Sequence, residues 1–190
     1  MILTQDNEYA AVLDACALVP MSLCDTLLRL AEDPAMYRPL WSEEILREVD
    51  STLQNKLKLT SGQAKRRMDS MRQAFPEAIV TIPPGLVKAL EGIPDKDDRH
   101  VLAVAIRAHA NVIVTQNIKH FPESEINQYG ILCHAPDDFL IHQFHLSPLQ
   151  VLDKLDAQAS AISQGRPEIV SSLRKVVPGF IELVEKWTSG

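Results

Sequence analysis

The chain has 190 residues, of which 46% are hydrophobic and 23% charged, so it is an ordinary globular chain with enough residues for one core and a small appendage. Its net charge of −6 means that a polyanion such as nucleic acid would need a local basic patch or bound cations. Three cysteines without CxxC spacing argue against a disulfide framework or a zinc knuckle, and favour a reducing cytoplasm.

The start of the chain and its apolar runs bear on targeting. Residues 1–6 lack a basic region followed by a long apolar stretch, so we expect no signal peptide. No apolar run approaches the roughly 18 residues that a membrane span needs, so we expect no membrane partner and a cytoplasmic location.

An apolar run from Tyr9 to Leu13 stops abruptly at Asp14, and small residues follow it. We predict a buried strand here, which places the Asp14 carboxylate at the carboxyl edge of a sheet. Open α/β sheets bind their ligands at that edge. An acid in this position can also simply end a strand, so a functional reading depends on the company that the rest of the chain brings.

Helical and strand-like patterns then alternate along the chain. In chain order we predict a helix at 22–31, a strand at 37–41, helices capped by Ser42 and Thr60, a strand at 78–82, a helix after Asp98, and strands at 112–115 and 131–133. This alternation predicts an α/β fold of three layers, with a central parallel sheet of four to five strands.

The pattern changes after residue 136, where no strand is predicted. Ser147 and Pro148 read as an N-cap followed by proline at the first helical position, and further helical stretches lie on both sides of Pro178. We therefore read residues 136–190 as helical, and we divide the chain into an α/β domain over 8–142 and a helical extension over 143–190. His142 and His145 could both bind zinc, but no third ligand lies at a suitable spacing, so a zinc site is disfavoured.

Three further polar residues are expected near Asp14. Asp98 begins the helix that precedes the 112–115 strand, Asn117 follows that strand, and Glu48 lies within the helix begun at Ser42. The carboxyl ends of parallel strands open on one edge, which brings Asp98 and Asn117 toward Asp14. The alternative readings are helix N-capping for the acids around Asp98, a solvated position for Glu48 and a turn role for Asn117.

Several segments together resemble a known family. They are VLD at 12–14, LWSEEILREV at 40–49, PDKDDRHVLA at 94–103, VIVTQN at 112–117, YGI at 129–131 and PDDFL at 136–140. In this order and spacing, the chain resembles the PIN-domain ribonucleases over roughly residues 8–142, and most closely the VapC-like toxins of bacterial toxin–antitoxin pairs.

The resemblance implies a metal-dependent endoribonuclease using Mg²⁺ or Mn²⁺. Asp14 and Asp98 match the family's principal metal-binding aspartates, and Glu48 matches its helix glutamate. Asn117 stands where the family usually has a fourth acid; being neutral, it weakens a second metal site. Auxiliary roles at the site are assigned to Asp95, Asp97 and Thr115. Hard divalent cations take oxygen ligands and can activate a water for attack on a phosphate.

An RNA substrate requires cationic contacts, which give affinity but no sequence reading. The candidates are Lys56, Lys58, Lys65, Arg66, Arg67, Arg99 and Lys119. The alternative for the cluster between 56 and 72 is a solvated helix face.

Partners and competing functions remain open at this point. The resemblance implies a cognate antitoxin, and the helical extension could bind it, cover the core or form a homodimer. Asn117, together with Cys16 where the family has a small polar residue, supports a PIN-like module that binds RNA or protein with weak or no catalysis. A phosphotransferase is disfavoured because Asp14 lacks the second acid of a DxD motif.

Overall fold

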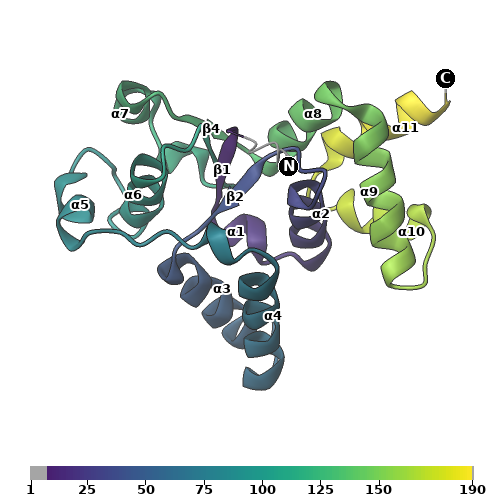
Figure 1. Cartoon of the computed structure of the whole chain (residues 1–190), viewed down its shortest axis with the longest axis horizontal. Coiled ribbons are helices and arrows are strands. Elements are labelled where there is room, and N and C mark those ends of the chain that lie inside the picture. The colour runs from purple at the N-terminus through teal and green to yellow at the C-terminus, as the bar shows by residue number, and fades with distance from the viewer. Residues whose placement is uncertain (1–7, 190) are drawn as a thin grey trace, which may run out of the picture.

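A computed structural model describes residues 8–189 and shows a parallel sheet flanked by helices (Figure 1). Residues 1–6, for which we predicted no signal peptide, lie outside the described residues. The four strands are β1 (Ala10–Leu13), β2 (Arg38–Leu40), β3 (Val112–Val114) and β4 (Leu132–His134). They pair in the order β2-β1-β3-β4, every pair parallel. The prediction of an α/β fold with a parallel sheet of at least four strands is therefore confirmed.

β1 lies at the centre of the sheet because all four of its residues are apolar and can be buried on both faces. In the β1–β3 register, Leu13 is opposite Val114, and the Asp14 backbone N–H donates to the Val114 carbonyl over 3.1 Å. This register places Asp14 and Thr115 side by side at the carboxyl edge of the sheet.

Helices and 3-10 turns connect the strands. They are α1 (Ala15–Leu18), α2 (Met21–Ala31), α3 (Glu43–Asn55), α4 (Ser61–Ala74), η1 (Pro76–Ala78), α5 (Pro84–Ala89), α6 (Arg99–Arg107), η2 (Ile118–His120), α7 (Glu123–Ile126) and η3 (Asn127–Tyr129). The predicted caps are confirmed where they begin α3 and α4. The Ser42 hydroxyl accepts from the Ile45 N–H, and Thr60 forms a capping box with Gln63.

The predicted strand at 78–82 is wrong. This segment pairs with the sheet only through an isolated parallel bridge between Trp41 and Ile79, next to η1. The Trp41 backbone N–H donates to the Ala78 carbonyl over 2.9 Å, and the Trp41 carbonyl accepts from the Val80 N–H over 2.8 Å. Two prolines follow at 83–84 and begin α5, and a proline has no N–H with which to continue a ladder.

The chain after β4 is helical, as predicted. It consists of α8 (Pro136–Leu146), α9 (Pro148–Ala161), α10 (Arg166–Leu173) and α11 (Pro178–Ser189), which lie across the sheet from α5 and α6 (Figure 1). Pro148 occupies the first turn of α9, but the Ser147 side chain makes no capping hydrogen bond. The proposed domain boundary between 142 and 143 lies inside α8 and stays an interpretation.

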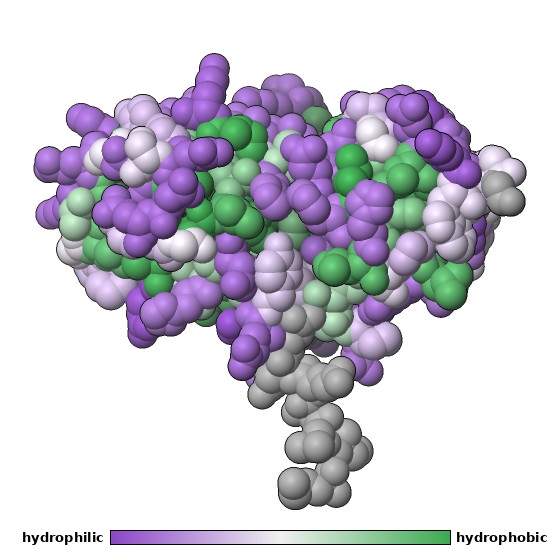
Figure 2. All heavy atoms as spheres, turned by 90° about the horizontal axis from the view of Figure 1, so that it is seen from above, coloured by the Kyte–Doolittle hydropathy of each residue, from purple (hydrophilic) through white to green (hydrophobic). Residues whose placement is uncertain are grey.

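Polar contacts join these helices to α2 and to one another. The Thr26 hydroxyl on α2 donates to Gln158 Oε1 on α9 over 2.7 Å. The Asp137 carboxylate on α8 accepts from the backbone N–H groups of Gly179 and Phe180, at 2.9 and 2.6 Å, at the start of α11. Seen from above, hydrophobic patches lie among hydrophilic residues on both sides of the molecule (Figure 2). Within residues 8–189, no helix is long and apolar enough to cross a membrane.

Candidate active site

Asp14 is held by the core at the end of β1. The residue is 3% exposed. Its Oδ1 accepts from the Ala15 N–H over 2.6 Å, and its Oδ2 accepts from the Thr115 hydroxyl over 2.6 Å and from the Cys16 thiol over 3.0 Å. These donors come from α1 and from the residue that follows β3, so the β1–β3 register helps to position the carboxylate.

The hydrogen bonds leave one lone-pair site of the Asp14 carboxylate free. An ionised carboxylate offers about four lone-pair sites and cannot donate. Three of these sites are taken by the protein, two of them on Oδ2. The remaining site lies on Oδ1, so Asp14 can bind a cation through one oxygen while its orientation stays fixed.

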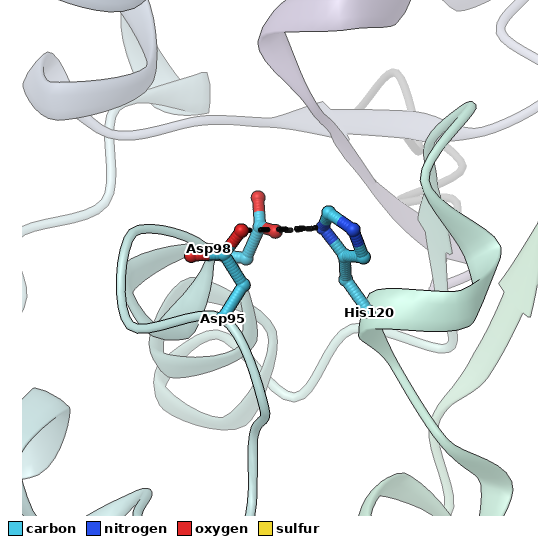
Figure 3. Close-up of side chains that lie close together, drawn as sticks. All are labelled: Asp95, Asp98 and His120. Carbon is cyan, nitrogen blue, oxygen red and sulfur yellow. Dashed lines mark hydrogen bonds and ion pairs between the residues drawn. The ribbon is translucent and has the colours of Figure 1, made fainter.

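Asp98 occupies the N-cap position of α6, but its side chain does not cap the helix. Its Oδ2 instead lies 2.5 Å from Nδ1 of His120, on η2 (Figure 3). Asp95 Oδ2 lies 3.6 Å from the same nitrogen, and the other Asp95 oxygen accepts from the Asp97 N–H over 3.0 Å. The alternative in which Asp98 serves only as a capping side chain is therefore wrong.

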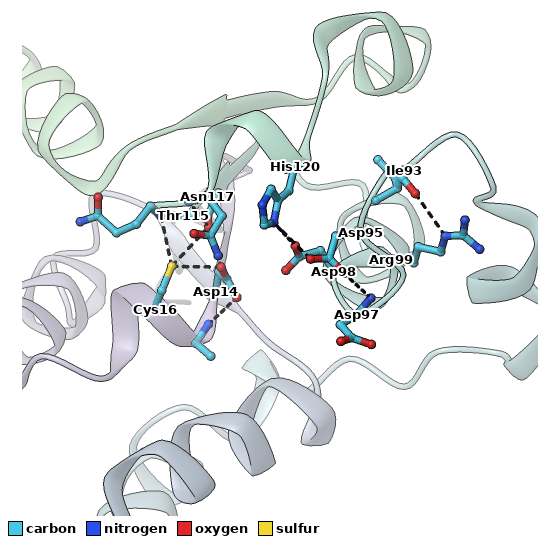
Figure 4. Close-up of polar contacts among 12 residues, drawn as sticks. Asp14, Cys16, Ile93, Asp95, Asp97, Asp98, Arg99, Thr115, Asn117 and His120 are labelled. Carbon is cyan, nitrogen blue, oxygen red and sulfur yellow. Dashed lines mark hydrogen bonds and ion pairs between the residues drawn. The ribbon is translucent and has the colours of Figure 1, made fainter. Parts of the chain in front are cut away.

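The charge of Asp14 acts on Asp98 across the edge of the sheet. Burial raises the pKa of Asp98 above its ordinary value, and the negative charge of Asp14 raises it further, while the His120 hydrogen bond opposes the rise. Figure 4 shows the Asp14 side chain on one side of His120 and the Asp98 side chain on the other. The site thus concentrates negative charge at the place where the sequence predicted it.

Glu48 reaches the site indirectly. Its Oε1 lies 2.9 Å from Nε2 of the buried His100, so the contact joins α3 to α6 two residues beyond Asp98. Burial disfavours protonation of this ring, but Glu48, with Glu44 and Asp14, raises the pKa of His100 above its ordinary value. This bond holds the start of α6 against α3.

Asn117 follows β3 and is half-buried. Its backbone N–H donates to the Thr115 hydroxyl over 3.0 Å, and that hydroxyl donates in turn to Asp14. The structure therefore brings Asn117 to the carboxyl edge of the sheet, beside Asp14 (Figure 4). As an amide it adds no negative charge there.

The donor set fits a divalent cation. Asp95, Asp98 and His120 each offer a ligand atom, and these atoms lie within 4.8 Å of one another. Carboxylate oxygens with an imidazole nitrogen are common ligands of divalent metals. Within residues 8–189, neither His142 nor His145 belongs to such a group, and the His142 ring stacks on His134 at 4.8 Å between centroids instead.

Three of the seven cationic candidates already have contacts inside the protein. Lys65 pairs with Asp69 at 2.5 Å. The Arg67 guanidinium donates to the carbonyls of Leu18 and Val19, next to the C-terminal end of α1. Arg99 donates to the carbonyls of Glu91 and Ile93 and points away from Asp98 (Figure 4).

The other four candidates, Lys56, Lys58, Arg66 and Lys119, are exposed. Among the described residues no ion pair engages them. They are therefore the cations that remain available to a phosphate backbone.

The site residues predicted from the sequence do not include His120, which contacts Asp98 in the structure. A signal was present: His120 follows Asn117 by three residues, which a single 3-10 turn brings onto the same side. The direction of its ring toward Asp98 depends on how that turn sits against α6.

Comparison with known proteins places this architecture in a family. Residues 10–119 match the model of the PIN domain. A protein of Mycobacterium tuberculosis (strain ATCC 25618 / H37Rv) named "Putative ribonuclease VapC50" is 36% identical over 95 residues, an alignment that covers 43% of this chain and 56% of that relative. The residues that match the PIN domain model include Asp14, Asp98 and Asn117 at the sheet edge and Glu48 on α3. Because the PIN domain model covers more than half of it, this chain belongs to the PIN domain family.

Proposed function

We propose that this protein is a metal-dependent endoribonuclease that cleaves RNA phosphodiester bonds and acts in the cytoplasm as the toxin of a bacterial toxin–antitoxin pair. The observation that carries the proposal is the pair of acids at one sheet edge, Asp14 fixed by the core and Asp98 facing it near His120. Membership in the PIN domain family and the likeness to a protein named as a ribonuclease support it.

The residues that would hold Mg²⁺ or Mn²⁺ are Asp98 and Asp14, with Asp95 as an auxiliary ligand. When bound, a divalent cation supplies charge stabilisation for the phosphate and makes a water more acidic. The free lone-pair site on Asp14 Oδ1 would offer that cation one oxygen held in a fixed orientation. Thr115 keeps Asp14 oriented, and positioned ligands of this kind govern metal affinity.

The remaining site residues shape the surroundings. Glu48 holds the first turn of α6 through His100, so it positions Asp98. Asn117 offers a neutral carbonyl oxygen, which can accept from a water or a substrate hydroxyl but attracts no second cation. Asp97 is exposed and adds negative potential from the loop before α6. The candidate ligands are three carboxylates, Asp14, Asp95 and Asp98, and Asn117 adds only a neutral amide. This set favours a single bound cation.

Phosphate contacts come from the exposed cations Lys56 and Lys58 after α3, Arg66 on α4 and Lys119 on η2. Lys65, Arg67 and Arg99 would first have to give up the contacts that they make within the protein. Such contacts give affinity that falls with salt and carry no sequence information.

A cognate antitoxin is the proposed protein partner. Large apolar side chains are exposed on three of the C-terminal helices, at Leu146 on α8, Leu149 on α9 and Trp187 on α11. Covering such side chains with an amphipathic helix removes apolar area from water. A homodimer that uses the same helices is the alternative, and analytical ultracentrifugation of the protein alone and with the product of the adjacent gene distinguishes the two.

The deciding experiment is cleavage of total RNA by the purified protein in Mg²⁺ or Mn²⁺. We expect cleavage that EDTA stops and that Asp14→Asn abolishes, with growth arrest on expression that a neighbouring small gene relieves. Cleavage that survives both EDTA and Asp14→Asn would overturn the proposal.

The second candidate is a PIN-like module that binds RNA or protein without efficient catalysis. Two observations favour it: three of the lone-pair sites of Asp14 are already occupied, and Asn117 is neutral. Stoichiometric RNA binding without metal-stimulated turnover is the result that selects this module.

A further inference from the structure

The loop after β3 has an amide where the family usually has an acid, and it also carries a histidine. Asn117 contributes an amide where the resemblance led us to expect an acid. Three residues later, η2 ends at His120, whose ring faces the acids of the α6 loop (Figures 3 and 4). Imidazole nitrogen is among the commonest metal ligands in proteins.

Two carboxylates converge on one nitrogen of this ring. Asp98 Oδ2 lies 2.5 Å and Asp95 Oδ2 3.6 Å from His120 Nδ1. A single N–H serves one acceptor well, and the longer of these separations exceeds hydrogen-bond distance. The second carboxylate is therefore held near the first without a hydrogen bond to this ring that would offset the repulsion.

In the described part of the chain, no lysine or arginine side chain neutralises these acids. Within residues 8–189, Asp95 and Asp98 form no ion pair with a lysine or an arginine, and His120 is their only ion-pair partner. Arg99 follows Asp98 directly, yet its guanidinium donates to the carbonyls of Glu91 and Ile93. The cluster is arranged for a cation that the protein does not itself supply.

We propose that His120 is a direct ligand of the divalent cation at this site, and that its nitrogen shifts the preference of the site from Mg²⁺ toward a first-row transition metal ion such as Mn²⁺. The inference rests on the proposed metal site and names a ligand that the predicted set lacked. Mg²⁺ is bound almost wholly through oxygen, whereas transition metal ions gain from an imidazole nitrogen.

The alternative is that His120 only positions Asp98 by a hydrogen bond. The two roles differ in what contacts the metal, because a positioning histidine leaves an all-oxygen coordination shell. Electron spin echo spectroscopy of bound Mn²⁺ detects a directly coordinated ¹⁴N nucleus and therefore separates them.

The experiment uses Mn²⁺ as the probe and the full chain without RNA. We expect ¹⁴N modulation from Mn²⁺ bound to the wild type, its loss in His120→Ala, and its retention in the matched control His145→Ala, whose histidine is exposed on α8. Circular dichroism checks that each variant is folded, and His120→Asn replaces His120→Ala if the latter does not fold.

The affinities give an independent readout. We expect His120→Ala to weaken Mn²⁺ binding on the order of 10- to 100-fold while Mg²⁺ binding changes less, because a metal-site histidine is worth at least what its supporting partners are. His120→Asp should remove the ¹⁴N signal and raise the affinity for Mg²⁺ relative to Mn²⁺, a reversal that a purely structural role would not produce.

Several results overturn the inference: no Mn²⁺ binding, an all-oxygen shell in the wild type, or a nitrogen signal that persists in His120→Ala. These outcomes are separable from failure of the nuclease proposal. Metal-dependent RNA cleavage with an all-oxygen shell defeats the inference alone, whereas nitrogen coordination without cleavage defeats the nuclease alone.

Discussion

The two acids of the candidate site are supported in different ways. Asp14 lies at the end of a buried central strand, is 3% exposed and accepts three hydrogen bonds from neighbouring elements. Asp98 lies in a surface loop at the start of α6, its side chain is 15% exposed, and its partner is the single side chain of His120. One half of the site is preorganised by the core, and the other half is carried by loops.

The position of Asp14 is therefore fixed, whereas the positions of the α6-loop acids can adjust. A carboxylate that ends a sheet strand cannot move without disturbing the register, so it gives a fixed reference for a bound cation. The acids of the α6 loop and His120 can shift by small amounts, because their positions depend on surface turns. The predictions below break or sharpen this contrast, from the largest effect to the smallest.

Asp14→Asn and Asp98→Asn should both reduce RNA cleavage by about 100-fold or more, since each removes a ligand oxygen's charge. Their effects on folding should differ. An asparagine at 14 presents an amide N–H₂ group to donors that need an acceptor, so we expect about 1–3 kcal/mol of destabilisation in urea unfolding. Asp98→Asn should not destabilise the metal-free protein at neutral pH, because the raised pKa of Asp98 means that the fold disfavours its charged form. Equal losses of stability would break the contrast.

Thr115→Val tests the core side without touching a carboxylate. Valine keeps the shape of this fully buried residue but removes the donor to Asp14 and the acceptor for the Asn117 N–H. We expect about 1–3 kcal/mol of destabilisation and about a 10- to 100-fold loss of cleavage. Thr188→Val, near the end of α11, is the matched control and should have little effect; a Thr115→Val protein as active as the wild type would contradict the role of Thr115.

The raised pKa of Asp98 predicts how metal-free stability depends on pH. Because the folded protein binds this proton more tightly than the unfolded chain, its contribution is fully present below the ordinary pKa of 3.8 and is lost as the pH rises through the folded value. In EDTA, Asp98→Asn should therefore gain stability relative to the wild type as the pH is raised from 4 to 7. Thermal unfolding across this range measures it, and Mn²⁺ should reduce the difference by binding the wild type.

Free and paired cations should contribute unequally to RNA binding. We expect Lys58→Gln to weaken RNA binding and to lower the slope of log affinity against log salt by about 0.7, the value for one phosphate contact on a single strand. Lys65→Gln, which removes a lysine already paired with Asp69, should change the slope less. Fluorescence anisotropy over a salt series, with Asp14→Asn as the background to prevent cleavage, compares the two.

Cys16 should give the smallest effect. Burial, with the Asp14 charge, raises the pKa of its thiol to about 12, so on the order of 1 in 10,000 molecules carries a thiolate at pH 8. Alkylation by iodoacetamide at pH 8, followed by mass spectrometry, should be slow at this position. Cys16→Ser retains a donor to Asp14 and should change cleavage by no more than about twofold; rapid alkylation or a large loss of activity would show that Cys16 is more than a supporting donor.

Local signals in the sequence were sufficient for the elements that carry the site. The apolar run before Asp14 predicted a buried strand, and the β-branched run at 112–115 predicted a second strand, because strands buried on both faces are apolar throughout. Ser42 and Thr60 marked helix starts because capping is decided within four residues. The predicted strand at 78–82 failed because a suitable composition does not create a partner with which to pair.

The sequence by itself determined that a buried strand of an α/β sheet would end at Asp14. It also determined that Asp98 and Asn117 would come to the same edge of that sheet, since parallel strands and their crossovers leave few alternatives. Only the tertiary structure decided that Asp98 faces His120 instead of capping α6, that Glu48 bonds His100, and that Arg67 and Arg99 turn to backbone carbonyls. Side-chain directions of this kind depend on how surface turns pack against helices distant in sequence. No local pattern of residues specifies that packing.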